Sequence, residues 1–175
     1  MKDELLFVVC LTKSGRRQYL LWRDGGDAPD GYAVLPKTGN ILAASSLEAI
    51  LALASKHHLN VSTRKPQFID LDLVFGVLSR LRPSRRVSKH ASEVLLECWN
   101  ALEDLARSAG VEPQALSSDP GHVNKIYEKL FLGNNLPAMK EGEREYQPHL
   151  DRDELFLLRR LLRDMDQKID WSATA

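Results

Sequence analysis

The spacing of hydrophobic residues changes about a quarter of the way along the chain. Up to residue 44, apolar and β-branched residues form short runs, "ELLFVVCLT" (4–12) and "RQYLLWR" (17–23), with the turn-forming "KSGR" between them. This order predicts a β-hairpin. After the loop "GGDAPDG", the segment "GYAVLPKTGNILAA" predicts one or two short strands around a Thr-Gly-Asn turn.

From residue 45 onward, apolar residues recur at helical spacing, and five helices are predicted. They cover residues 45–58, 71–82, 92–109, 120–132 and 151–169, and their ends are marked by Ser45 with Glu48, Asp70, Pro83, Gly110, Asp119, Gly133, and Asp151 with Glu154. Residues 60–68 are interpreted as a connection. The order of elements predicts an α+β fold, in which N-terminal antiparallel hairpins or a small sheet precede a predominantly helical C-terminal part. We expect one domain over residues 1–175, β-rich over 1–44 and helical over 45–170.

Composition is that of an ordinary globular protein. Hydrophobic residues make up 43% and charged residues 27% of the 175 residues, and no apolar run approaches the roughly 20 residues that a membrane span needs. The N-terminus "MKDELLFVV" carries acids and is a poor signal peptide. Cys10 and Cys98 both lie in apolar patterns, so buried free thiols are expected rather than a disulfide. We therefore expect a cytoplasmic protein that does not contact a membrane.

The net charge is zero, but the charges are unevenly distributed along the chain. Residues 1–90 contain 14 Lys and Arg against 8 Asp and Glu, whereas residues 91–175 contain 10 against 16. Such an asymmetry suggests a charged partner. The alternative is that the two halves interleave in space and their fields cancel.

No motif in the sequence is typical of a catalytic or metal site. There is no Gly-rich phosphate loop, no CxxC pair and no Gly-x-Ser-x-Gly segment. His57 and His58 are adjacent, so on a helix their side chains point about 100° apart and are poorly placed to share a metal ion. Buried thiols are also poor nucleophiles. We expect a protein that is not an enzyme and that uses no metal, cofactor or small-molecule substrate.

A basic cluster lies between the second and third predicted helices, formed by Arg80, Arg82, Arg85, Arg86 and Lys89. Such a cluster can hold phosphates, which makes a nucleic-acid-binding regulator the alternative function. No aromatic residue interleaves with the cluster for base stacking, and the chain is neutral. A solvated loop is therefore the simpler interpretation, and no direct nucleic-acid contact is expected. Contact with an acidic partner, or with the acidic half of this protein, stays open.

The third and fifth predicted helices each have one unusual feature. In the third, a broad apolar arc includes Trp99 and Leu102, which should be buried. The opposite stripe is either a solvated face or a contact surface, and it consists of Glu93, Glu97, Asn100 and Asp104. In the fifth, Phe156 lies opposite the apolar face, among arginines. The apolar face itself is formed by Leu155, Leu158, Leu161, Leu162, Met165 and Ile169.

Three segments within residues 70–109 carry a family resemblance: "DLDLVFGVL", the loop "RPSRRVSK", and "LLECWNALEDLARSAG" with its pattern Leu-Leu-x-x-Trp-Asn-x-x-x-Asp-Leu-Ala. They resemble the immunity proteins of bacterial contact-dependent growth inhibition systems. The resemblance implies a small cytoplasmic protein that forms a heterodimer with the C-terminal domain of its cognate toxin and blocks it by occlusion. Many such toxins are nucleases that act on tRNA or DNA. The neutral charge departs from the strongly acidic inhibitors that mimic nucleic acid.

The resemblance transfers no contact residue, because toxin-facing residues vary within that family. An acidic surface would be attracted to a basic nuclease cleft, so the acidic second half supplies the candidates. The predicted partner-binding residues are Glu141, Glu143, Glu145 and Tyr146 in the polar segment 134–150, Glu97 and Asp104 on the acidic stripe, and Phe156.

Overall fold

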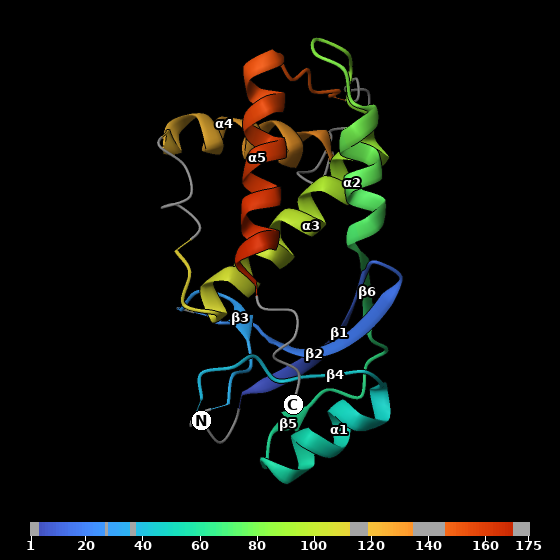
Figure 1. Ribbon diagram of the computed structural model, residues 1–175, viewed down its shortest axis with the longest axis vertical. Helices are drawn as coiled ribbons and strands as arrows, with labels where there is room; N and C mark the ends of the chain where they lie inside the picture. Colours follow the sequence, from blue (N-terminus) through green and yellow to red (C-terminus); the bar gives the residue numbers. More distant parts are fainter. Residues whose placement is uncertain (1–3, 27, 36–37, 113–118, 135–145, 170–175) are drawn as a thin grey trace, which may run out of the picture. The chain divides into compact units, whose positions relative to one another are not determined.

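Figure 1 shows a computed structural model of the protein, which describes residues 4–26, 28–35, 38–112, 119–134 and 146–169. The fold is α+β, as predicted, because a sheet of early strands precedes a set of helices. The chain divides into two compact units. Unit 1 comprises Met1–Asp72, Glu103–Val111 and Lys168–Ala175, and unit 2 comprises Leu73–Leu102 and Glu112–Gln167. Each unit is built from separate stretches of chain, and the single domain over residues 1–175 stays a prediction.

The sheet of unit 1 is built on the predicted hairpin. Strand β1 (Leu5–Lys13) pairs antiparallel with β2 (Arg16–Arg23). The outer edge of β2 pairs with two short strands, β3 (Gly31–Tyr32) and β4 (Ala43–Ala44), also antiparallel. These short strands flank the predicted Thr-Gly-Asn turn, in which Gly39 has a φ of 72°.

The hairpin turn is tied to a distant carboxylate. Ser14 and Gly15 have φ values of 52° and 69°, as the two central residues of a type I′ turn require. Their backbone N–H groups donate to the carboxylate of Asp72, at 2.8 and 3.0 Å. These two bonds stabilise the ionised carboxyl group and lower the pKa of Asp72.

The interpretation of residues 60–68 as a plain connection is wrong. This part of the chain contains β5 (Asn60–Val61) and leads into β6 (Gln67–Asp70), and both pair parallel with β1. The sheet is therefore mixed rather than only antiparallel, and the segment 45–170 is not purely helical. The physical reason is that these strands are short and alternate weakly, so their backbone partners come from β1 and not from a local pattern.

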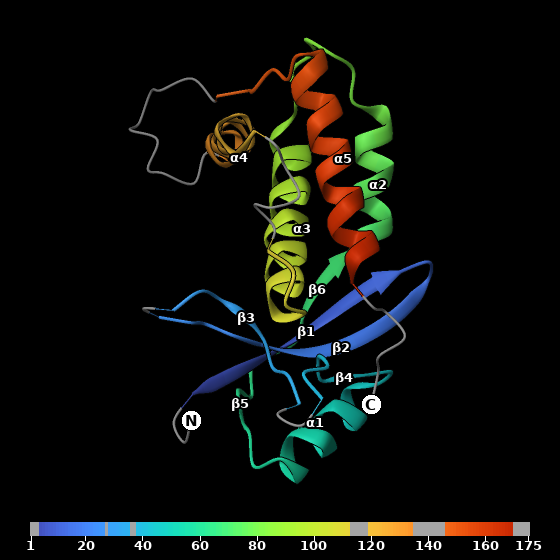
Figure 2. The ribbon, with the colours of Figure 1, turned by 60° about the vertical axis from the view of Figure 1, so that its left-hand side comes forward.

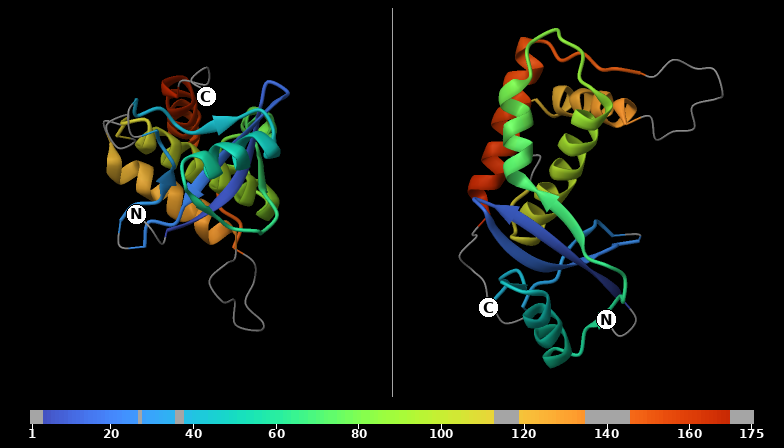
Figure 3. Two further views of the ribbon diagram at one scale, coloured as in Figure 1. Left: turned by 90° about the horizontal axis from the view of Figure 1, so that it is seen from below. Right: turned by 90° about the vertical axis from the view of Figure 1, so that its right-hand side faces the viewer.

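One face of this sheet is covered by helix α1 (Leu47–Lys56), as Figure 3 shows from below. The helix begins at Ser46, whose hydroxyl accepts a hydrogen bond from the backbone N–H of Ala49 at 3.1 Å. The predicted cap, Ser45, is therefore off by one residue. Between α1 and the sheet lies a core of Leu6, Val8, Leu21, Leu42, Ala44, Ile50 and Ala54.

Unit 2 consists mainly of helices. They are α2 (Leu71–Arg80), α3 (Lys89–Ser108), α4 (Pro120–Gly133) and α5 (Arg152–Lys168), and the last residues of α3 and the first two of α2 belong to unit 1. Figure 2 shows α2 beside α5, and α4 end-on. Trp99 and Leu102 are buried, as predicted, and so is the apolar face predicted for α5. Ala109, the last residue of the predicted helix 92–109, is exposed because α3 ends at Ser108.

The predicted caps of α4 and α5 are confirmed. Asp119 accepts a hydrogen bond from the backbone N–H of His122 at 3.0 Å. Asp151 accepts from the backbone N–H of Glu154, whose carboxylate accepts from the N–H of Asp151 in return, which is a reciprocal capping box. The bonds from the backbone N–H groups lower the pKa of Asp151. Glu154 is buried, and its other oxygen pairs with Lys129 of α4, so the box also joins α4 to α5.

Charge is balanced within each unit. The sequence ranges of unit 1 contain 11 Lys and Arg and 11 Asp and Glu, and those of unit 2 contain 13 of each kind. The asymmetry between the two halves of the sequence is thus not an asymmetry between units, and charge has to be considered one surface at a time. Among the helices that the structure describes, none combines the length and apolarity needed to cross a membrane.

Candidate partner-binding surface

The acidic stripe of α3 has two different environments. In unit 1, Asp104 accepts hydrogen bonds from the indole N–H of Trp22 and from the guanidinium of Arg107, each at 3.0 Å. Burial raises the pKa of Asp104, and these hydrogen bonds oppose that rise. Asp104 therefore does not continue the solvent-facing stripe, and its contacts hold the end of α3 to the sheet of unit 1.

Arg107 and Ser108 extend this internal network. Arg107 also donates to the backbone carbonyl of Asp30 and to Glu103, each at 3.0 Å. The hydroxyl of Ser108 accepts from the N–H of Tyr32 and donates to the carbonyl of Asp104, both at 2.7 Å. Asp104, Arg107 and Ser108 therefore all form hydrogen bonds with other groups of unit 1.

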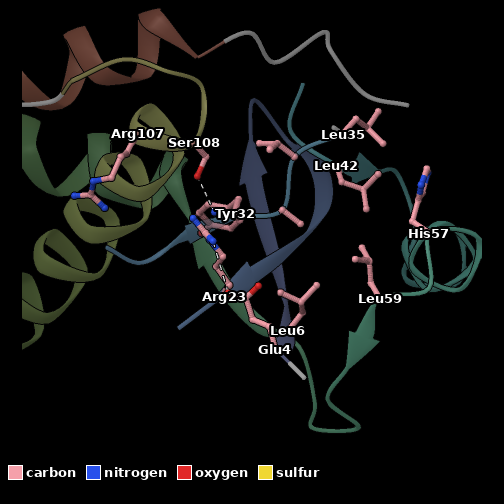
Figure 4. Close-up of a pocket in the computed structure, with 12 residues that line it drawn as sticks. Glu4, Leu6, Arg23, Tyr32, Leu35, Leu42, His57, Leu59, Arg107 and Ser108 are labelled. Atoms are coloured by element: carbon pink, nitrogen blue, oxygen red, sulfur yellow. Dashed lines mark hydrogen bonds and ion pairs between the residues drawn. The ribbon is translucent and has the colours of Figure 1, made fainter. Parts of the chain in front are cut away.

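A pocket of about 400 Å³ lies next to this network in unit 1. Figure 4 shows its leucines, Leu6, Leu35, Leu42 and Leu59, together with the Glu4–Arg23 ion pair at 3.7 Å. Its lining also includes Tyr32, Ala33, Val34, His57, Arg107 and Ser108. Sequence patterns did not predict this pocket, because its lining comes from segments far apart along the chain.

In unit 2 the rest of the stripe is exposed. Glu93, Glu97 and Asn100 are all exposed on α3. Beside them, the hydroxyl of Tyr127 on α4 donates to the side-chain carbonyl of Asn100 at 3.1 Å. The ring of Tyr127 meets the buried Trp99 edge to face, with 5.5 Å between centroids. The predicted candidate Glu97 therefore lies at an α3–α4 junction.

Two further exposed residues, at the end of α4, were not predicted. The side chains of Phe131 and Leu132 are 39% and 46% exposed, whereas the preceding Leu130 is fully buried. Phe131 lies one turn beyond Tyr127 on the same face of α4. Two residues after Phe131, Gly133 packs against Ser92 of α3, so α4 follows α3 from Asn100 back to Ser92. We name Glu93, Glu97, Asn100, Tyr127 and Phe131 the α3–α4 surface.

Gly133 fixes this surface to the rest of unit 2. A Cβ atom on Gly133 would lie 2.5 Å from the Ser92 hydroxyl and 2.9 Å from ring carbons of Pro148, so only glycine fits without displacement. Asn134 directly follows Gly133, and Tyr146 lies two residues before Pro148. Tyr146 is 42% exposed, as expected for a contact candidate. Glu141, Glu143 and Glu145 lie outside the described residues.

The last predicted candidate, Phe156, lies on a different surface. It is 65% exposed on α5, and most of the exposed side chains around it are arginines, with one acid, Asp153, a turn before it. The arginines of the basic cluster and Lys89 are exposed as well. The structure thus groups Glu97 with the α3–α4 surface and groups Phe156 with basic residues.

The two cysteine thiols are the strongest nucleophiles that the sequence offers, and both are shielded. Cys10 and Cys98 are free and buried, as predicted, and burial raises the pKa of both thiols. A thiol with a raised pKa is a poor nucleophile at neutral pH. Across the described stretches of the chain, no group of three or more His, Cys, Asp or Glu is arranged to hold a metal ion.

Comparisons with known proteins give one distant structural likeness. A scan against protein-family models found no match, and a search of curated proteins found none either. Among solved structures, the C-terminal domain of SatS, in a crystal structure in complex with bromine, is similar over 94% of this chain and 92% of that chain. The sequence identity is 11% and the TM-score is 0.48. A likeness of this size assigns neither a family nor a function.

Proposed function

We propose that the protein is a cytoplasmic binding protein that neutralises a cognate toxin domain by covering it, as immunity proteins of contact-dependent growth inhibition systems do. The resemblance within residues 70–109 supports this function. The observation that carries it is the α3–α4 surface, where Tyr127 of α4 contacts the exposed stripe of Glu93, Glu97 and Asn100 and the exposed Phe131 follows one turn later on α4.

The chemistry of this surface fits a basic protein partner. The half-buried ring of Tyr127 and the exposed ring of Phe131 can be covered by a partner, and aromatic side chains buried at an interface often contribute much of the binding energy. Acids at the rim, here Glu93 and Glu97, raise the association rate with a basic partner and disfavour acidic ones. A nuclease toxin domain has such a basic surface, because its substrate is a polyanion.

The scaffold behind the surface is well fixed. Trp99 and Tyr127 pack between α3 and α4, and Gly133 locks the end of α4 against Ser92 and Pro148. A surface on rigid elements binds with a smaller ordering cost than a mobile one. The sequence between Gly133 and Pro148 also contains Glu141, Glu143, Glu145 and the exposed Tyr146.

The direct test uses the C-terminal domain of the protein encoded immediately upstream of this gene. We expect that domain to stop bacterial growth when it is expressed alone, and co-expression of this protein to restore growth. The two purified proteins should elute together with one-to-one stoichiometry in size-exclusion chromatography. Growth arrest without rescue, or two separate elution peaks, would contradict the proposal.

Variants then test which surface makes the contact. We expect the combined change Glu93→Lys, Glu97→Lys and Phe131→Ala to weaken the complex at least about tenfold, with the larger loss at low salt. The matched control is Glu112→Lys with Asp153→Lys, two exposed acids of unit 2 outside this surface. Equal affinities of the two variants would place the contact on another surface.

A further inference from the structure

The outward face of α5 carries a basic stripe with an aromatic ring in it. Arg152, Phe156, Arg160 and Arg163 are all exposed, and they follow one another at intervals of four, four and three residues. At this spacing the side chains share one face of the helix. The stripe extends along α5 for about 16 Å, given the rise of 1.5 Å per residue.

The basic cluster of residues 80–89 is held against the same helix. The backbone N–H groups of Ser84 and Val87 donate to the carbonyls of Leu150 and Pro148, at 2.7 and 2.8 Å, directly before α5 begins. Arg86 forms a β-bridge with His149. Figure 3, on the right, shows α2 beside α5, with the chain after α2 passing the end of α5.

Arg159 of α5 binds the end of α2. Its guanidinium donates to the carbonyl of Leu78 at 2.8 and 3.2 Å and to that of Leu81 at 3.0 Å, which are orphan acceptors at the end of α2. The cluster Arg80, Arg82, Arg85 and Arg86 is thus fixed next to α5 rather than free in a long loop. The arginines of residues 80–86 and those of α5 are far apart in the sequence but lie on one surface.

The acids near this surface do not neutralise it. Glu154 is buried and paired with Lys129, and Asp151 is engaged in the capping box. Asp153 is exposed and Asp164 and Asp166 are half-buried on α5, three acids against seven exposed arginines. Within the described ranges, none of these arginines forms a salt bridge with an acid.

We propose that this surface, formed by Arg80, Arg82, Arg85, Arg86, Arg152, Phe156, Arg160 and Arg163, binds single-stranded nucleic acid. Guanidinium groups contact the phosphates, and the ring of Phe156 stacks on an unpaired base, which is the combination that single-strand binding proteins use. The basic cluster lacks an aromatic residue in the sequence, and α5 supplies one from about seventy residues away. An acidic polypeptide would satisfy the arginines but would offer the exposed ring no flat partner.

The test is fluorescence anisotropy with the full chain and a labelled mixed-sequence RNA of about 20 nucleotides, titrated at several salt concentrations. We expect binding that weakens steeply with salt. The combined change Arg152→Gln, Arg160→Gln and Arg163→Gln should lower the slope of log affinity against log salt by about 2, because each lost phosphate contact removes about 0.7 on a single strand. The matched control, Lys56→Gln with Lys65→Gln, changes two exposed lysines of unit 1 and should leave the slope unchanged.

The ring provides the second arm of the test. Phe156→Ala should weaken RNA binding at least about fivefold, and Phe156→Trp should restore it. Phe68→Ala is the matched aromatic control, since Phe68 is 60% exposed on β6 in unit 1, and it should have no effect. Absence of binding at low salt would overturn the proposal. So would unchanged affinity in Phe156→Ala, or displacement of the RNA by polyglutamate at equal charge concentration, which would indicate an acidic protein partner instead.

Discussion

Glu97 and Asp104 lie two turns apart on the same face of α3, yet their surroundings are opposite. Glu97 is exposed beside α4 in unit 2, and Asp104 accepts two hydrogen bonds inside unit 1. The unit 2 portion of α3 is held by apolar packing, with Trp99 against Tyr127. The unit 1 portion is held by side-chain hydrogen bonds: Asp104 accepts from Trp22 of β2, Ser108 accepts from Tyr32 of β3, and Arg107 donates to the loop before β3.

This difference teaches what helical periodicity can and cannot predict. Periodicity locates the buried arc correctly up to Ala106, in both portions, because the arc depends only on which side of the helix is apolar. It does not tell whether the opposite stripe faces water or other polar groups. That depends on partners such as Trp22, which is 82 residues from Asp104 in the sequence.

The largest effect is expected from the apolar portion. Trp99→Ala should lower the free energy of unfolding by about 3–5 kcal/mol, because it removes a buried indole and its edge-to-face contact with Tyr127. Urea denaturation monitored by circular dichroism measures this loss. The effect on stability should exceed any effect on the affinity of the folded protein for its partner. A loss below about 1 kcal/mol would show that hydrogen bonds, and not apolar packing, hold this portion.

The next effect is expected from the polar portion. Asp104→Ala should cost about 1–3 kcal/mol, because it leaves the Trp22 indole N–H and one Arg107 donor without their acceptor. Asp104→Asn keeps an acceptor oxygen and should cost less. The same denaturation experiment measures both variants. If Asp104→Ala lowered the free energy of unfolding no more than a change at an exposed residue does, Asp104 and the exposed part of the stripe would have equivalent surroundings.

Much of the fold could be predicted from the sequence where local signals decide it. The hairpin with Ser14 and Gly15, and the caps Asp119 and Asp151, follow from residue types that suit their backbone positions. Strands β5 and β6 could not be predicted, because their partner is β1 and their own sequence is too short for a clear alternation. The choice of Ser46 over Ser45 depends on the backbone entering α1.

The candidate surface was only partly predictable. Glu97, Tyr146 and Phe156 are exposed as expected. Phe131 and Leu132 were missed, although three consecutive apolar residues cannot all face one side of a helix, and only Leu130 is buried. That run was the available signal. Its phase depends on where α3 packs, which the sequence of α4 alone does not contain.

A smaller effect should appear in the dependence of stability on pH. Burial raises the pKa of Asp104 in the folded protein above its value in the unfolded chain, so the folded state binds this proton more tightly. The resulting contribution to stability is present below the unfolded pKa and is lost as pH rises through the folded pKa. Asp104→Asn should abolish this loss of stability with rising pH, whereas Glu97→Gln should leave the loss unchanged. Parallel profiles of unfolding free energy for wild type and Asp104→Asn would contradict the assignment.

The smallest effect is expected from Glu97 itself. Glu97→Ala should change the free energy of unfolding by no more than about 0.5 kcal/mol, because an exposed carboxylate loses little when it is removed. Its consequence should instead appear in association kinetics, since a rim acid acts by steering a basic partner and its removal lowers the association rate more than it raises the dissociation rate. Stopped-flow binding at two salt concentrations measures this, and the wild type and the variant should converge at high salt. A destabilisation comparable with that of Asp104→Ala would mean that Glu97 has an internal role, and the contrast between the two ends of α3 would then be one of degree only.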